Sequence, residues 1–72
     1  MEKFEELIQS PDSDSRIFAA EHGYGWDVLI RDPEPDVRLA VAMQGYKLDI
    51  LVKDDDENVR DAAKYMLNME NR

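Results

Sequence analysis

Cysteine is absent from this 72-residue chain, which excludes disulfide bonds, thiolate metal sites and cysteine nucleophiles. No apolar run approaches the roughly 18 residues of a membrane span, and residues 1–6 carry more acidic than basic side chains, where a secretory signal is basic. We therefore expect a cytoplasmic protein. Basic residues are also scarce: 9 Lys and Arg stand against 17 Asp and Glu, a net charge of −8. That charge repels phosphate and anionic lipid, so we expect neither nucleic acid nor a membrane as a direct partner.

The chain is nevertheless organised as a short repeat, and internal repeats decide the fold. The same residue types recur every 22 positions at apolar, acidic and basic sites, among them Phe4, Trp26 and Leu48; Leu7, Leu29 and Leu51; Asp12, Glu34 and Asp56; and Arg16, Arg38 and Arg60. We place the units at about residues 3–24, 25–46 and 47–69. They form one domain over residues 1–72, without a linker.

Each unit has the pattern of two short helices. Its first part carries apolar residues at i, i+3 and i+4, as in Trp26, Leu29 and Ile30, which is the spacing of one helical face rather than of a strand. Val37, Ala40 and Val41 repeat that spacing in the second part. The pattern predicts an all-α chain with helices near residues 2–9, 13–22, 25–31, 35–44, 47–53 and 57–69.

Residues typical of helix ends mark both ends of the second helix. Glu34, Pro35 and Asp36 have the order of a cap, a first-turn proline and an acid near the positive helix end, and Asp12 and Asp56 occupy the same cap position as Glu34. Gly23 and Gly45 are expected to adopt the left-handed conformation that closes a helix, with Tyr24 and Tyr46 folding back. Unit three has Leu67 in place of that glycine, so its last helix should run on.

The apolar positions of both helices predict one continuous core. It comprises Leu7, Ile8, Trp26, Leu29, Ile30, Val37, Val41, Leu48, Leu51, Val52 and Val59. A core of this size is marginal in so short a chain, because about 60 residues bury only about 60% of their unfolded surface. Regular helices or a partner must therefore add stability.

The segment from Asp32 to Ala42 resembles the turn and second helix of a HEAT-type repeat, and the segment from Asp54 to Ala63 repeats it. In that family the aspartate and the arginine six residues later form a hydrogen-bonded ladder along the stacked units. The resemblance implies this role for Asp32, Arg38, Asp54 and Arg60. Unit one has Ser10 in place of the aspartate, so we expect the ladder to begin weakly there.

The 22-residue period is about half that of HEAT and armadillo units and is closer to the variant leucine-rich repeat, which the chain also resembles. Both families are α-solenoids that bind other macromolecules along an extended surface. The resemblance therefore implies a right-handed mini-solenoid of three helical pairs. The first helix of each pair is α-helical or 3₁₀.

Residues that suggest a chemical site have simpler explanations. Asp54, Asp56 and Asn58 have the first alternate ligand positions of a calcium loop, but Val59 and Tyr65 replace its glycine and glutamate. We expect no metal, no cofactor and no enzymatic activity, because neither His22 nor the serines have a recognisable catalytic partner. The repeated arginines are expected to pair with nearby acids rather than to bind a ligand.

Acids gather in the aligned turns, and capping requires only one side chain for each helix start. This surplus and two tyrosines at helix ends give the candidate partner-binding residues: Asp32, Asp36, Asp55, Glu57, Tyr24 and Tyr46. We predict a non-enzymatic protein-interaction module whose acidic edge binds a protein with a basic surface. Two alternatives stay open: a phosphate-mimicking inhibitor of a nucleic-acid-binding protein, and a small self-associating protein such as a homodimer.

Overall fold

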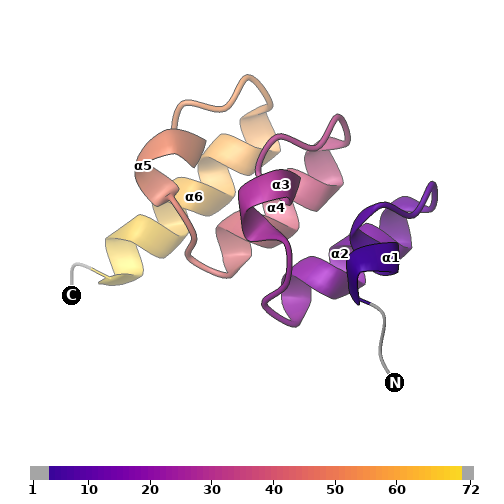
Figure 1. Cartoon of the computed structure of the whole chain (residues 1–72). Coiled ribbons are helices and arrows are strands. Elements are labelled where there is room, and N and C mark those ends of the chain that lie inside the picture. The colour runs from indigo at the N-terminus through magenta and orange to yellow at the C-terminus, as the bar shows by residue number, and fades with distance from the viewer. Residues whose placement is uncertain (1–3, 71–72) are drawn as a thin grey trace.

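A computed structural model describes residues 4–70, except for the side chain of Glu70, and the regular secondary structure of this part of the chain is helical (Figure 1). Three short helices alternate with three longer ones: α1 (Phe4–Ile8), α2 (Ser13–Glu21), α3 (Trp26–Leu29), α4 (Pro35–Met43), α5 (Leu48–Leu51) and α6 (Glu57–Glu70). The predicted all-α class is confirmed, and no strand occurs among the described residues. The predicted start of the first helix, near residue 2, lies outside that range.

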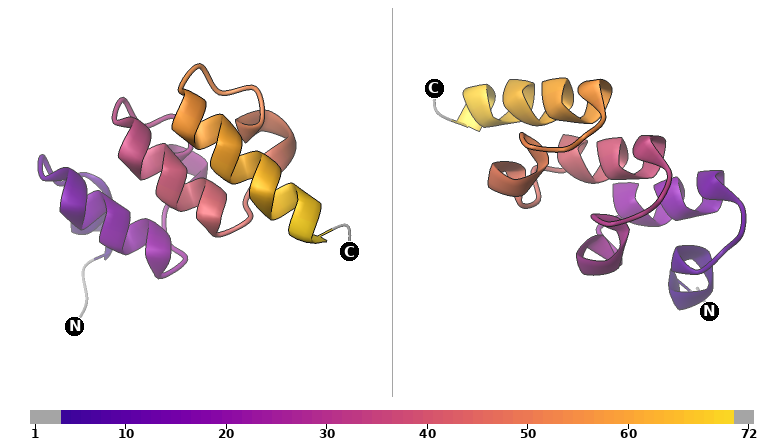
Figure 2. Two further views of the ribbon diagram at one scale, coloured as in Figure 1. Left: turned by 180° about the vertical axis from the view of Figure 1, so that it is seen from behind. Right: turned by 90° about the horizontal axis from the view of Figure 1, so that it is seen from above.

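The longer helices lie side by side in chain order. Helix α4 packs between α2 and α6, and the short helices all lie on one face of these three (Figure 2). We call α2, α4 and α6 the long-helix layer, and α1, α3 and α5 the short-helix layer. No helix in residues 4–70 combines the length and apolar character needed to cross a membrane.

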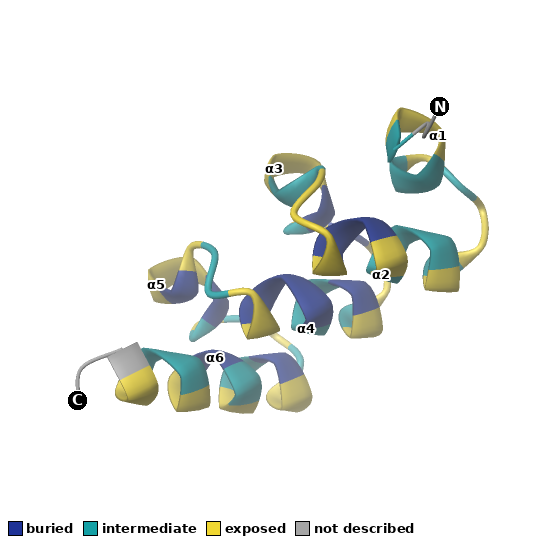
Figure 3. Ribbon diagram, turned by 90° about the horizontal axis from the view of Figure 1, so that it is seen from below, coloured by how far each residue is buried: buried dark blue, intermediate teal, exposed yellow. Residues whose placement is uncertain are grey.

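The core lies between the two layers, as Figure 3 shows by the buried inner faces of α2, α4 and α6. Leu29 and Leu51 of the short helices are each 1% exposed, and Val37, Val41 and Val59 of the long helices are fully buried. Leu48 is buried as well. The remaining predicted core residues are only partly buried and pack against this cluster: Leu7, Ile8, Trp26, Ile30 and Val52.

Trp26 shows why an aromatic residue fits one of these partly buried positions. Its indole Nε1 donates a hydrogen bond of 2.8 Å to the carbonyl of Ala20, so the polar end of the ring is satisfied while its body contacts the core. Such a partner is what a buried tryptophan requires. The bond also ties α3 to the end of α2.

Glycines close the first two long helices as expected. Gly23 and Gly45 have φ values of 85° and 83°, in the left-handed region that favours glycine. The amide of Tyr24 then donates to the carbonyl of Ala19 at 2.9 Å. Without such a glycine, α6 continues for 14 residues, which confirms the predicted extension.

Candidate functional site

The turn before each long helix is held by a side-chain oxygen that accepts an amide hydrogen two residues later. Asp32 Oδ1 accepts from Glu34 N and Asp54 Oδ1 accepts from Asp56 N, both at 2.9 Å. In the first turn the hydroxyl oxygen of Ser10 accepts from Asp12 N at 3.1 Å. Serine therefore replaces aspartate in this local role, because either side chain can form the turn.

The residues at the cap position differ in what they do. Asp12 accepts a hydrogen bond from Asp14 N, and Asp56 accepts from the amides of Asn58 and Val59. Glu34, which the sequence indicated as a third cap, makes no side-chain bond to its helix. Glu34 does occupy the predicted N-cap position before Pro35, but without a side-chain cap bond: glutamate is not among the good N-cap side chains, and the Glu34 amide donates to Asp32.

Each of the three repeated arginines folds back on its own turn. Nη1 donates to the carbonyl oxygen six residues earlier: Arg16 to Ser10 at 2.6 Å, Arg38 to Asp32 at 2.6 Å and Arg60 to Asp54 at 2.7 Å. One edge of every guanidinium is thereby fixed. Its Nε and Nη2 atoms are left to bond a further acceptor.

Two of these arginines use that remaining edge to bond the next turn. Arg16 donates from Nε to Asp32 Oδ2 at 2.7 Å and from Nη2 to Oδ1 at 3.2 Å. Arg38 makes the equivalent pair with Asp54 at 2.9 and 3.1 Å. These bidentate pairs join residues 16 positions apart and fix the turns relative to one another.

The first pair corrects the expectation that the ladder begins weakly in unit one. Arg16 has both bonds to Asp32 and its own carbonyl bond, so the serine at position 10 removes nothing from the Arg16–Asp32 junction. The aspartate of each pair comes from the following unit. Ser10 takes no part in the Arg16–Asp32 pair.

The paired groups are largely shielded from water. Side-chain exposure is 12% for Arg38 and 9% for Asp54. Hydrogen bonding to Asp54 raises the pKa of Arg38 and outweighs the opposing effect of burial. Burial would by itself raise the pKa of Asp54, but the hydrogen bonds from Arg38 and from the Asp56 amide lower it, and the resulting pKa lies below the ordinary value. The ionised pair is therefore the favoured state.

Burial also divides the candidate partner-binding acids. Asp32 is only 6% exposed and is held by Arg16, so it presents no free carboxylate; as a surface candidate it is ruled out. Asp36 and Glu57 are exposed. The Asp55 side chain is 94% exposed, and its Oδ1 accepts a hydrogen bond of 3.2 Å from Arg38 Nη2. These three acids remain as candidates.

The candidate tyrosines face different surroundings. Tyr24 is 45% exposed and stacks on Phe4 with ring centroids 3.7 Å apart. Tyr46 is partly buried, with its ring 5.2 Å from Trp26. The rings thus pack on the aromatic residue of the first helix in their own unit. Tyr24 offers more free surface than Tyr46.

Sequence reasoning missed two exposed apolar positions on the short-helix layer. Val28 is 58% exposed and Ile50 is 53% exposed, although both lie inside helices. They occupy the same position in successive repeat units. The signal was present as an apolar residue outside the i, i+3, i+4 face of each short helix.

In the described part of the chain, no group of three or more His, Cys, Asp or Glu residues is placed to hold a metal ion. The carboxylates that come closest to the arginines are used in pairing and in turns. Comparisons of this chain with protein-family models, curated proteins and solved structures gave no match. Function must therefore be argued from the arrangement of its own residues.

Proposed function

We propose that this protein is a small right-handed α-solenoid, similar to HEAT and variant leucine-rich repeats, that acts as a non-enzymatic protein-interaction module. Its three turns project from one side of the helices (Figures 1 and 2). The arginine–aspartate pairs support this proposal because they bond each turn to the next along the chain. A surface that repeats at fixed spacing is the form in which solenoids bind extended partners.

Exposed acids at these turns determine which kind of partner the surface favours. Asp36, Asp55 and Glu57 face solvent, and we call this set the acidic edge. Arg16 and Arg38 pair with the shielded Asp32 and Asp54, whose charges offset theirs, and Arg38 contacts Asp55 through a single bond of 3.2 Å, so much of the negative potential of the exposed acids remains. The edge therefore favours a partner with a basic surface and speeds its encounter, an effect that salt weakens.

The test compares two variants with equal net charge. Asp36→Asn, Asp55→Asn and Glu57→Gln together neutralise the acidic edge, and Glu21→Gln, Asp49→Asn and Asp61→Asn neutralise three exposed acids elsewhere. Proteins captured by the wild type from a lysate of its own cells are purified, and their association rates are measured against ionic strength. We expect a fall of about tenfold for the edge variant at low salt, and a much smaller fall for the control.

Three outcomes would contradict the proposal or change its class. Equal rates for both variants, with no salt dependence, would show that the acidic edge is an ordinary solvated surface. Competition of the captured protein by duplex DNA would favour the phosphate-mimicking inhibitor. A light-scattering mass of two chains or more, without any captured partner, would favour the self-associating protein.

A further inference from the structure

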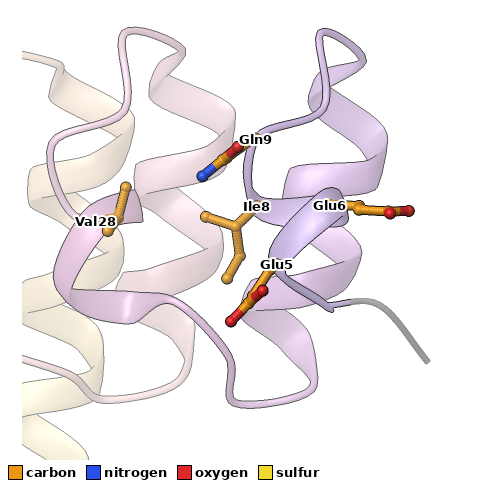
Figure 4. A pocket seen from close by; sticks show the side chains of 5 residues that line it. All are labelled: Glu5, Glu6, Ile8, Gln9 and Val28. Atoms are coloured by element: carbon orange, nitrogen blue, oxygen red, sulfur yellow. The ribbon is translucent and has the colours of Figure 1, made fainter. Parts of the chain in front are cut away.

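Two open hollows lie on the short-helix layer, and no residue of the acidic edge lines them. The first, of about 520 Å³, is lined by residues of α1 and α3; the second, of about 350 Å³, is lined by residues around α3 and α5. Their linings are Glu5, Glu6, Ile8, Gln9 and Val28 for the first, and Asp27, Ile30, Arg31, Tyr46, Lys47 and Ile50 for the second. Figure 4 shows Ile8 and Val28 on opposite sides of the first hollow.

The two hollows are the same feature in successive units. Shifting the first lining by one repeat unit converts Ile8 into Ile30 and Val28 into Ile50. The acid Glu5 becomes Asp27 in the same way. Each hollow thus has an isoleucine on one side, a β-branched residue on the other and an acid beside them.

The apolar side of each hollow is not required by the fold. Unit one carries Glu6 at the position of Val28 and Ile50, and Figure 4 shows Glu6 directed away from Val28. The short helix therefore accepts a charged residue there. Leaving Val28 and Ile50 more than half exposed gains little core burial, so their apolar character points to a contact outside the chain.

The charges around the two hollows differ. Glu5 makes the first acidic, whereas Arg31 and Lys47 outweigh Asp27 at the second. The ion pairs of the described residues all involve Arg16 or Arg38, so these rim charges are not used in such pairs there. A bound segment that runs from the first hollow to the second would meet a negative and then a positive surface, which fixes its direction.

We propose that these hollows bind one extended segment of a partner protein. Two of its apolar side chains enter the hollows, with a basic residue beside the first and an acidic residue beside the second. The hollows lie in successive repeat units, whose long helices pack side by side, and packed helices are about 8–10 Å apart. An extended chain covers that distance in about three residues at roughly 3.1–3.4 Å each. The segment therefore has its apolar residues about three positions apart.

This inference rests on the proposed interaction function and names a second contact surface for it. It is tested with a library of random twelve-residue peptides displayed on phage, selected against the whole chain. Enriched peptides are synthesised with a fluorophore and titrated by anisotropy. We expect them to share the order basic, apolar, spacer, apolar, acidic.

Variants decide whether the peptides occupy the hollows. Val28→Ser with Ile50→Ser should weaken binding at least tenfold, whereas Met43→Ser, at a 44% exposed position of the long-helix layer, should change it less than twofold. Val28→Thr with Ile50→Thr keeps the β-branched shape and provides a second test if the serine variant loses helicity. Arg31→Glu with Lys47→Glu should abolish the preference for the acidic residue.

Other outcomes overturn the proposal. Failure to enrich any peptide, a consensus without the apolar pair, or equal binding to the serine, threonine and Met43 variants would each exclude docking at the hollows. The acidic-edge variant separates the two ideas. If basic peptides are enriched whose binding depends on Asp36, Asp55 and Glu57 but not on Val28 and Ile50, the proposed function stands and the present inference fails.

Discussion

The helix that ends the chain differs from the two long helices that are followed by another. Ala20 of α2 and Ala42 of α4 are fully buried, whereas Lys64, at the same repeat position of α6, is exposed. Likewise Leu39 is partly buried where Asp61 is exposed. An apolar residue thus stands where the next helix packs, and a charged residue stands where the described chain has no further helix. Charged residues at such positions are typical of terminal repeats, and Tyr65 of the same helix is 60% exposed beside them.

The opposite end of the molecule is not polar in this way. Phe18 of α2 is 45% exposed, and its ring lies 4.1 Å from that of His22. At the same repeat position, Ala40 of α4 is buried to 6% exposure. The two ends are therefore unlike each other. The charged residues Asp61 and Lys64 are exposed on α6, while aromatic side chains are exposed beside α1.

The largest expected loss of stability comes from a lysine in α4 at the position equivalent to Lys64 of α6. Ala42→Lys puts a long charged side chain at a fully buried position between packed helices, so it should lower the free energy of unfolding by on the order of 3 kcal/mol. The reverse change, Lys64→Ala, should alter it by less than about 0.5 kcal/mol. Urea denaturation followed by circular dichroism measures both. Similar losses would mean that the two positions are not as different as their burial indicates.

The repeated arginines also differ between the middle and the last long helix. Arg38→Ala leaves the shielded Asp54 carboxylate without its bidentate partner and should cost about 1–3 kcal/mol. Arg60→Ala removes one bond to a carbonyl and should cost less than about 1 kcal/mol. Arg31→Ala, at an exposed position, is the control and should be near neutral. Equal melts for the three variants would reject a stabilising role for the Arg38–Asp54 pair.

A third comparison concerns the residues that precede α3 and α5. Gly25 and Lys47 are 22 positions apart and both have positive φ, 72° and 51°. A Cβ at Gly25 would lie 2.6 Å from Cγ1 of Ile8, so Gly25→Ala should destabilise by about 1–2 kcal/mol. Lys47→Gly relieves a left-handed lysine and should stabilise by up to about 1 kcal/mol. Thermal melts that shift in the same direction would contradict this.

The smallest expected effect is a pH dependence. The pKa of Asp54 in the folded chain lies below its ordinary value of 3.8, so folding stabilises the ionised carboxylate. Its contribution is fully present above that value and is lost as the pH falls through the folded-state pKa. We expect the loss of stability below about pH 4 to be weaker in Arg38→Ala than in Arg60→Ala. Urea melts from pH 6 to pH 2.5 make the measurement; parallel curves would contradict it.

The 22-residue register and local chemistry of the chain predicted the helices and most of their ends. Apolar spacing locates a helical face, and a glycine such as Gly45 ends a helix through its own backbone freedom, so neighbouring residues suffice. The bonds between Arg38 and Asp54 are those that the resemblance to HEAT repeats implied. Asp61 and Lys64 of the last unit were also visible in the sequence, but only the burial of the equivalent residues of α4 showed that these positions face a neighbouring helix.

Tertiary structure alone decided which of many similar acids are available. Asp32 and Asp55 lie in equivalent turns, yet one is shielded beside Arg16 of the preceding unit and the other faces water. Sequence spacing does not determine that difference, because it depends on how one helical pair packs against the next. The exposure of Val28 and Ile50 has the same origin, since the short helices bury only the face turned toward the long-helix layer.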